Sequence, residues 1–275
     1  MLDNVLEVFC DTAPQSMWRA IASAKSERSI GLGTLGFHTY LQYKSIPMQS
    51  TGAVVFNKLL YSTIKLQATK ASINLAAKRG EPEDMKGTGM RHAHLMAIAP
   101  NASSSIICGG ASPSIEPLAA NAFTQKTKSG SHEVRNPALQ ERLEELGKNN
   151  EEVWESIILN KGSVQHLEFL SDHDKHVFKT ATETDAMTMI KLAADRQPFI
   201  CQAQSLNLFF PADVEAKTLH QTHFNAWKLG LKSLYYLRSS SVKSTSVGLL
   251  PEVLKQEPEQ PTVCSLDGDC KSCEG

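Results

Sequence analysis

The residues best suited to chemistry, by type and spacing, are the cysteines at the end of the chain. Three of the six lie in the final segment Cys264-Ser-Leu-Asp-Gly-Asp-Cys270-Lys-Ser-Cys273-Glu-Gly275, and Cys270 and Cys273 are spaced C-x-x-C. Thiols at this spacing commonly have a lowered pKa, and they exchange with a disulfide through a mixed-disulfide intermediate. The spacing predicts a carrier of reducing equivalents. Half of a zinc site, which needs four ligands, and a tail without a role are the alternatives.

A second candidate site follows the apolar run His-Leu-Met-Ala-Ile-Ala-Pro over residues 94–100. Such a run predicts a strand buried on both faces, as in a parallel α/β sheet. It leads into Asn101-Ala-Ser103-Ser104-Ser105, where hydroxyls and free amides past a strand end can bind an anion. A phosphate cradle and an ordinary serine-rich turn both fit these residues.

Gly31, Gly33 and Gly36 match the pattern G-x-G-x-x-G. A dinucleotide site also needs a preceding strand and an acidic residue about 20 positions further on. Charged residues precede these glycines, and no Asp or Glu follows them before Glu81. We therefore expect the glycines to allow a close approach of two backbones, with a nicotinamide-dependent dehydrogenase as the alternative.

The elements that must position these residues follow from apolar periodicity and capping signals. Helices are predicted over residues 2–9, 51–79 before Gly80, 136–147 with Asn136 as N-cap, from Asn150 onward, 172–196, and 211–229. Strands are predicted for a hairpin at 123–134 and for 203–210 and 231–238. The order strand, helix, strand at the end of this series predicts a βαβ unit.

Composition limits the class of protein. The chain has 275 residues, 41% of them hydrophobic, and 28 basic residues balance 29 acidic ones, so no overall charge favours nucleic acid or an acidic membrane. No apolar run approaches the roughly 20 residues that cross a bilayer, and the start lacks a signal peptide. Cys10, Cys108 and Cys201 do not form a secreted disulfide framework. A cytoplasmic protein is expected, with Cys108 and Cys201 as packed thiols.

The composition changes after Arg238. Serine, proline and charged residues replace the apolar periodicity over 239–263. We expect a globular domain over 1–238, a flexible linker over 239–263 and a redox-active tail over 264–275. A coil of about 25 residues has an r.m.s. span of roughly 25–30 Å, which would let the tail move between a buried site and the surface.

Seven separated stretches of the chain share one resemblance. They are Leu2-Asp-Asn-Val-Leu-Glu, Arg28-Ser-Ile-Gly-Leu-Gly, Ala99-Pro-Asn-Ala-Ser-Ser, Ser114-Ile-Glu-Pro, Gln202-Ala-Gln-Ser-Leu-Asn, Trp227-Lys-Leu-Gly-Leu-Lys-Ser-Leu-Tyr-Tyr-Leu-Arg and the terminal cysteine segment. In this order, and over nearly the whole chain, they resemble the C-terminal part of the large, catalytic subunit of class I ribonucleotide reductases. That family reduces ribonucleoside diphosphates to deoxyribonucleotides by radical chemistry.

The resemblance implies roles for particular residues. Tyr235 and Tyr236 match the tyrosine pair that passes a radical towards the active-site cysteine, although an aromatic pair packed in a strand is the ordinary reading of two such residues. Cys270 and Cys273 match the pair that reduces the active-site disulfide again. The residues that match the substrate phosphate loop are Pro100, Asn101, Ala102, Ser103 and Ser104, with Asn101 where the family usually has Ser or Thr.

The resemblance also implies a fold and partners. The fold expected is α/β, the second half of a ten-stranded α/β barrel with C-terminal βαβ elements and a flexible tail. The radical-bearing cysteine and the two reducing cysteines match nothing here, so a separate N-terminal large-subunit fragment is expected. The other expected partners are a small subunit carrying the diiron centre and tyrosyl radical, and thioredoxin or glutaredoxin, with no cofactor or metal in this chain. A non-catalytic remnant or interaction module of the same fold is the alternative.

Overall fold

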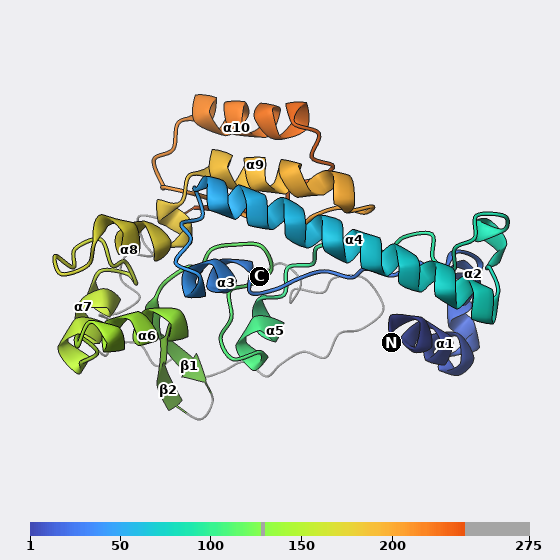
Figure 1. Cartoon of the computed structure of the whole chain (residues 1–275), viewed down its shortest axis with the longest axis horizontal. Coiled ribbons are helices and arrows are strands. Elements are labelled where there is room, and N and C mark those ends of the chain that lie inside the picture. The colour runs from blue at the N-terminus through green and yellow to red at the C-terminus, as the bar shows by residue number, and fades with distance from the viewer. Residues whose placement is uncertain (128–129, 240–275) are drawn as a thin grey trace, which may run out of the picture. The chain divides into compact units, whose positions relative to one another are not determined.

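The computed structural model describes residues 1–127 and 130–239, which are mainly helical with four short strands (Figure 1). The predicted linker, beyond Ser239, and the cysteine tail lie outside these residues. The helices are α1 (Leu2–Thr12), α2 (Trp18–Glu27), α3 (Phe37–Tyr43), α4 (Thr51–Arg79), α5 (Ala102–Ile107), α6 (Pro137–Glu145), α7 (Glu151–Leu159), α8 (Asp172–Val177), α9 (Ala186–Arg196) and α10 (Ala216–Lys228). The strands are β1 (Ala122–Thr127), β2 (Gly130–Arg135), β3 (Leu208–Phe210) and β4 (Leu237–Ser239).

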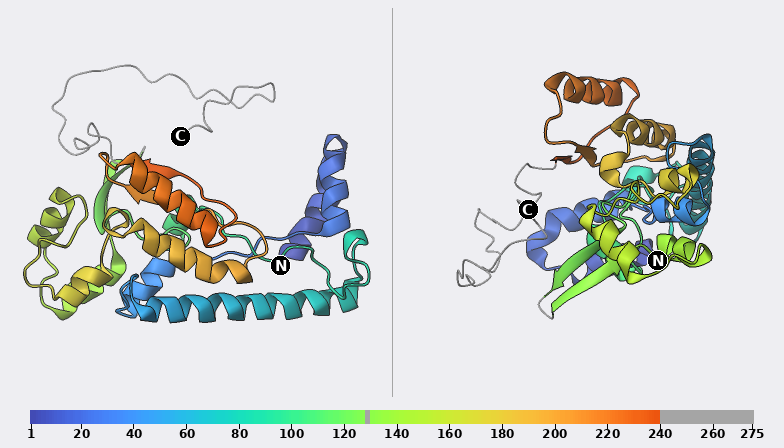
Figure 2. Two further views of the ribbon diagram at one scale, coloured as in Figure 1. Left: turned by 90° about the horizontal axis from the view of Figure 1, so that it is seen from above. Right: turned by 90° about the vertical axis from the view of Figure 1, so that its left-hand side faces the viewer.

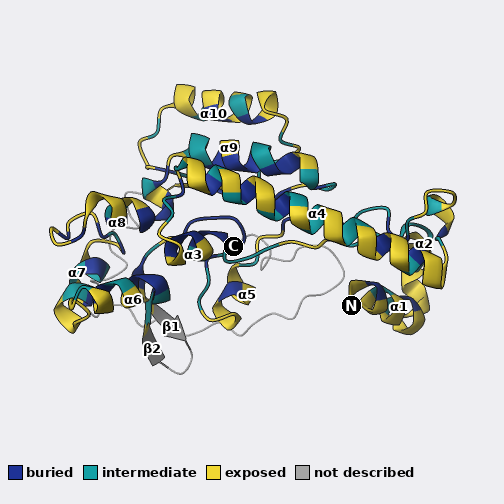
Figure 3. Cartoon of the chain, in the orientation of Figure 1, coloured by how far each residue is buried: buried dark blue, intermediate teal, exposed yellow. Residues whose placement is uncertain are grey.

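Helix α4 confirms the long helix predicted over 51–79. The Ser50 hydroxyl caps its start by accepting the backbone N–H of Ala53 at 3.2 Å, and Gly80, at φ +82°, follows its last residue. Its buried residues include Tyr61, and the helix packs on α9. Figures 1 and 2 show α4, α9 and α10 as successive layers, and buried residues gather on α9 whereas α10 is mainly exposed (Figure 3).

Three extended segments pair in parallel at the centre of the described residues. The segment 94–98 lies between 30–32 and 202–205, and parallel bridges join it to both neighbours, Leu32 with Met96 and Ile98 with Gln204. Leu95, Met96 and Ile98 are buried. The burial predicted for the run 94–100 is confirmed at Leu95, Met96 and Ile98 but is wrong at the end of the run, where Ala99 and Pro100 are exposed. The regular strand is not confirmed, because the pairing is limited to single bridges.

The βαβ unit predicted near the end of the chain is confirmed. Strands β3 and β4 pair in parallel, Leu208 opposite Leu237 and Phe210 opposite Ser239, and α10 connects them. The strands are shorter than the predicted ranges 203–210 and 231–238. The helix begins at Ala216 instead of Pro211 because residues 211–215 form a turn before it.

The single helix predicted over 172–196 is wrong. The chain forms α8, a turn at Ala181–Glu183, and α9. Thr180 and Glu183 form a reciprocal capping box, and the Asp185 side chain accepts the N–H of Thr188 at 3.1 Å to begin α9. These caps start two new elements inside the range that was predicted as one helix.

Two other helix starts and the hairpin agree with the sequence. The Asn136 side chain accepts the N–H of Ala138 at 3.1 Å, and the Asn150 side chain accepts that of Val153 at 3.0 Å. Strands β1 and β2 pair antiparallel, Ala122 opposite Arg135. Residues 128–129 between them are not described.

Helix α1 is held by a buried carboxylate. Asp3 lies within 3.0 Å of the guanidinium groups of Arg28, Arg79 and Arg91. Burial raises the pKa of Asp3, but the hydrogen bonds from the three arginines outweigh it and leave that pKa at about 2. The cluster joins α1 to the segments that enter the parallel core.

The core consists of two hydrophobic clusters. The first surrounds α3, α4 and α9 and includes Leu41 and Ile190, and the second surrounds α6 and α7 and includes Leu139 and Trp154. The α3 residue His38 reaches from the first cluster towards the second. Its Nδ1 accepts the N–H of Leu118 at 3.2 Å, and the ring also bonds to the backbone of Val177.

The three cysteines in the described part of the chain are all free. Cys10 is buried, and Cys201 is half-buried with its Sγ 3.1 Å from the backbone nitrogens of Leu95 and Met96. Cys108 is exposed at the end of α5, so the expectation of a packed thiol is wrong there. In the part of the chain that the structure describes, no helix is both long enough and apolar enough to cross a membrane.

Candidate functional site

The predicted phosphate loop lies at the start of α5, directly after the buried segment 94–98. Pro100, Ala102, Ser103 and Ser104 are exposed there, whereas Ser105 is buried. The first amides of a helix have no acceptor within the helix. The serine hydroxyls and these amides are therefore accessible donors for an anion.

Asn101 precedes α5 without capping it through its side chain. Its Oδ1 instead accepts the backbone N–H of Ser114 at 2.7 Å. Ser114 has φ +48°, a left-handed conformation that a non-glycine residue seldom adopts without support. Asn101 thus ties the predicted phosphate loop to the loop that carries Ser114-Ile-Glu-Pro.

Glu116 continues this connection into the parallel core. Its carboxylate is buried and accepts two hydrogen bonds from Asn207: Oε1 from the backbone N–H at 2.9 Å, and Oε2 from the side-chain amide at 3.1 Å. Burial raises the pKa of Glu116, and the hydrogen bonds from Asn207 oppose that effect. Glu116 therefore fixes both the backbone and the side chain of Asn207.

Tyr235 and Tyr236 lie immediately before β4 and are partly exposed. Their ring centroids are 4.1 Å apart with planes inclined at 52°. The backbone N–H of Tyr236 donates to Asn207 Oδ1 at 3.1 Å, and the Arg238 guanidinium lies 5.6 Å from the Tyr236 ring. A hydrogen bond with Tyr236 raises the pKa of Tyr235, so the Tyr235 ring is a neutral phenol near pH 7.

These hydrogen bonds, together with the short stretch of backbone between Ser114 and Glu116, form one continuous path. It runs through Asn101, Ser114, Glu116, Asn207 and Tyr236. The structure thereby brings the predicted phosphate loop and the tyrosine pair onto a single framework, although they are more than 130 residues apart in sequence. Cys264, Cys270 and Cys273 lie outside the described residues, so the structure does not place them.

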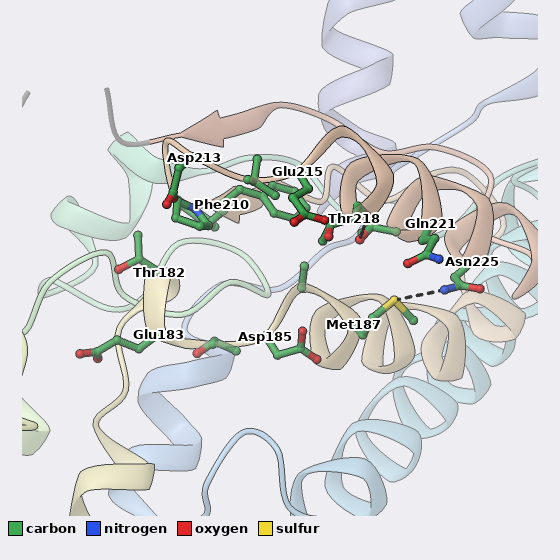
Figure 4. Close-up of a pocket in the computed structure, with 16 residues that line it drawn as sticks. Thr182, Glu183, Asp185, Met187, Phe210, Asp213, Glu215, Thr218, Gln221 and Asn225 are labelled. Carbon is green, nitrogen blue, oxygen red and sulfur yellow. Dashed lines mark hydrogen bonds between the residues drawn. The ribbon is translucent and has the colours of Figure 1, made fainter. Parts of the chain in front are cut away.

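A cavity of about 630 Å³ lies elsewhere, between α9, α10 and the end of β3 (Figure 4). Acidic side chains line it, including Glu183, Asp185, Asp213 and Glu215. Two of these already have structural partners: Glu183 accepts the N–H of Thr180, and Asp185 caps α9. The cavity contains none of the predicted site residues.

Of the glycines in the G-x-G-x-x-G match, Gly33 allows the expected close approach of two backbones. A Cβ added to Gly33 would lie 2.5 Å from the Ala97 carbonyl oxygen, and one added to Gly31 would lie 3.1 Å from the Ala97 Cβ. Gly36 precedes α3 at φ +76°. Within residues 1–127 and 130–239, no three His, Cys, Asp or Glu side chains gather in a way that would hold a metal ion.

Sequence reasoning missed Glu116 and Asn207 as members of the site. Both stand in stretches that contributed to the resemblance, but no spacing rule connects positions 91 residues apart. The available signal was an acidic residue between Ile115 and Pro117 in an otherwise uncharged loop, since a buried Glu requires a specific partner.

Comparison with known proteins identifies the family. The chain matches the family described as "Ribonucleotide reductase, barrel domain" over residues 1–88 and 82–237. It is 44% identical over 278 residues to the "Putative ribonucleoside-diphosphate reductase large subunit" of Frog virus 3 (isolate Goorha), and it is also 44% identical, over 281 residues, to the "Ribonucleoside-diphosphate reductase large subunit" of Invertebrate iridescent virus 3. These matches cover 100% of this chain but 47% and 43% of the relatives, so the chain spans less than half of their length.

A solved structure agrees with the sequence matches. The "Actinobacillus ureae class Id ribonucleotide reductase alpha subunit" is 42% identical and superposes with a TM-score of 0.81. The superposition covers 90% of this chain and 46% of that one. The chain therefore belongs to the ribonucleotide reductase large-subunit family, and it corresponds to part of the barrel domain.

Proposed function

We propose that this chain is the C-terminal part of the catalytic subunit of a class I ribonucleoside-diphosphate reductase, which makes deoxyribonucleotides for DNA synthesis. The observation that carries the proposal is the hydrogen-bonded path from Asn101 through Glu116 and Asn207 to Tyr236. A loop suited to anions and a tyrosine pair suited to radical transfer share one framework, as this reaction requires.

In this proposal the chain supplies the second half of a ten-stranded α/β barrel. The parallel segments 30–32, 94–98 and 202–205 and the β3–β4 pair would be its strands. Unpaired strand edges favour addition of further strands, and the complementary barrel half would come from the N-terminal portion of the large subunit. That half would bring the radical-bearing and reducing cysteines.

The substrate would bind by its phosphates at the start of α5. Backbone amides of Ala102, Ser103 and Ser104 and the two serine hydroxyls would donate to the diphosphate of a ribonucleoside diphosphate. Pro100 ends the buried segment, and Asn101 holds the loop against Ser114. The nucleoside would then extend towards the complementary half.

Tyr235 and Tyr236 would relay the radical. A neutral phenol loses an electron and its hydroxyl proton together, becoming a tyrosyl radical, and regains both from the next donor. The 4.1 Å between ring centroids suits such an exchange between neighbours. The diiron centre and initiating tyrosyl radical would belong to the small subunit, which binds near this pair.

Cys270 and Cys273 would restore the active site after each turnover. One thiolate attacks the active-site disulfide and releases a thiolate there, and the second attacks the resulting mixed disulfide. Two electrons pass to the active site, and Cys270 and Cys273 become a disulfide. Thioredoxin or glutaredoxin would reduce that disulfide in the cytoplasm. Neither nucleic acid nor a membrane is proposed as a partner of this chain.

Variants within the assembled enzyme test this assignment. The mixture contains this chain, an N-terminal large-subunit fragment, the small subunit, a ribonucleoside diphosphate and thioredoxin with its reductase. Tyr235→Phe or Tyr236→Phe should abolish turnover, since a phenylalanine ring has no hydroxyl proton to give up. Cys270→Ser or Cys273→Ser should stop turnover with thioredoxin but permit it with a small dithiol that reaches the site directly.

Matched substitutions separate these roles from folding. Tyr43→Phe changes another exposed tyrosine and should leave turnover unchanged. Persistent turnover in the Tyr235→Phe enzyme would contradict the relay. A folded wild-type chain that assembles with its partners but yields no product would favour a non-catalytic module of the same fold.

A further inference from the structure

The pairing between the segment 206–208 and the tyrosine segment contains one extra residue. In a parallel ladder, a carbonyl accepts from the residue after its partner, and an N–H donates to the residue before its partner. The Leu206 carbonyl accepts the N–H of Tyr235 at 2.9 Å, which makes Leu234 its partner. The Leu208 N–H donates to the carbonyl of Tyr236 at 2.9 Å, and Leu208 pairs with Leu237.

Between these two pairs the tyrosine segment advances three residues, from Leu234 to Leu237, whereas the segment 206–208 advances two. This two-against-one arrangement is a β-bulge, with Tyr235 and Tyr236 opposite Asn207. Successive side chains of a regular strand point to opposite faces. The bulge breaks that alternation, and the two adjacent rings can lie 4.1 Å apart.

A bulge also leaves a backbone group without a partner in the ladder. Here that group is the N–H of Tyr236, and the side chain of Asn207 supplies the acceptor at 3.1 Å. Asn207 is itself buried, so its side-chain amide depends on protein partners for its hydrogen bonds. The side chain of Asn207 takes the place of the missing ladder bond.

Glu116 fixes the orientation of Asn207. Because Oε2 accepts from the Asn207 side-chain nitrogen, the amide oxygen must face Tyr236. Both carboxylate oxygens accept, one from the backbone and one from the side chain of the same residue. The charged group within reach of this carboxylate from the tyrosine segment is Arg238, whose charge favours the ionised form.

We propose that Glu116 and Asn207 are a positioning pair that holds the bulge and so sets the ring of Tyr235 against that of Tyr236 for radical transfer. This inference rests on the proposed function. Neither residue exchanges the electron or the proton. They act by setting the distance and orientation between the two rings, on which the rate of transfer depends.

The hydrogen-bond pattern permits a test by exchange of donor and acceptor. Asn207→Asp replaces the amide donor with a second carboxylate, which cannot donate to Glu116 Oε2. Glu116→Gln replaces one carboxylate oxygen with an NH₂ group, which cannot accept a hydrogen bond from Asn207. Combining Glu116→Gln with Asn207→Asp restores all three bonds: the Gln oxygen accepts the backbone N–H, the Gln amide donates to Asp, and the other Asp oxygen accepts from Tyr236.

In the assembled enzyme each single variant should lower kcat by about 10- to 100-fold, the size of effect that misplacement by about 1 Å produces. KM for the ribonucleoside diphosphate should stay unchanged, since the α5 loop is intact. The double variant should recover to within a few-fold of wild type. Single variants with wild-type kcat, or a folded double variant as impaired as the singles, would overturn the proposal.

A second readout uses this chain alone and does not depend on turnover. With ¹³C-labelled tyrosine, nuclear magnetic resonance follows the ionisation of Tyr235, whose pKa the contact with Tyr236 raises. The single variants should return that pKa towards its ordinary value, and the double variant should restore it. Asn136→Ala, which removes a buried asparagine that caps α6, should leave this titration unchanged. A Tyr235 titration that is the same in all variants would overturn the positioning role even if the wild-type enzyme gives no product.

Discussion

The buried ring of His38 makes the stability of the chain sensitive to mild acid. The side chain is 1% exposed, and burial lowers the pKa of His38 to about 4 from the ordinary value of 6.5. Its Nδ1 accepts the N–H of Leu118, so a proton there would place two N–H groups against each other. The ring is therefore neutral in the folded chain.

The magnitude follows from this difference in pKa. Between the two values the unfolded chain binds a proton that the folded chain excludes, so the free energy of unfolding falls as the pH falls. The His38 contribution to that loss is about 2 kcal/mol between about pH 7 and about pH 5, and it approaches about 3 kcal/mol below pH 4. Most carboxylates remain ionised at pH 5, which isolates the effect.

Urea unfolding of the full chain at the two pH values measures this loss. His38→Gln keeps an acceptor for Leu118 and a donor for the backbone of Val177 but cannot be protonated. Between about pH 7 and about pH 5, the free energy of unfolding of the variant should fall by about 2 kcal/mol less than that of wild type. His173→Gln, at an exposed histidine, is the control. An equal loss in wild type and His38→Gln would refute the reasoning.

Two further predictions concern the framework that carries the site. Gly33→Ala should destabilise the chain by about 1–3 kcal/mol in urea unfolding, because its methyl group meets the Ala97 carbonyl at 2.5 Å. Gly31→Ala should cost less, since its methyl group meets a side chain at 3.1 Å, and equal costs would contradict this account. Asp3→Asn should cost about 3–5 kcal/mol at neutral pH, because it removes the buried carboxylate that three arginines share and leaves buried Arg28 paired with the half-exposed Glu7. A loss below 1 kcal/mol would show that the arginines find other partners.

Local signals predicted much of the secondary structure. The starts of α6 and α7 were readable because Asn136 and Asn150 are residues with a strong capping preference, and the end of α4 because Gly80 follows it. The βαβ unit was readable from the order of its elements. For the helix ends, the determining interaction lies within a few residues.

The sequence-based predictions were wrong where one local pattern was compatible with two structures. Thr180 and Asp185 lie inside the range 172–196 that was predicted as one helix, and their capping became visible only in the structure. The exposure of Cys108 depends on where α5 ends, which apolar content alone does not determine.

The candidate site was predictable in its parts but not in its connections. The residues 100–104 and the tyrosine pair were proposed from their types and from resemblance. The bulge at Tyr235 could not be anticipated, because a strand pattern assumes a regular ladder. Its support from Glu116 and Asn207 joins segments 91 residues apart, a separation at which only the folded chain shows a contact.

The most direct test of the account is deoxyribonucleotide formation in mixtures from which one component is omitted. The complete mixture contains this chain, the N-terminal fragment, the small subunit, a ribonucleoside diphosphate and a thiol reductant. The account predicts deoxyribonucleoside diphosphate from the complete mixture and none when this chain or the N-terminal fragment is left out. Product from the mixture that lacks this chain, or no product from the complete mixture with every component folded, would contradict it.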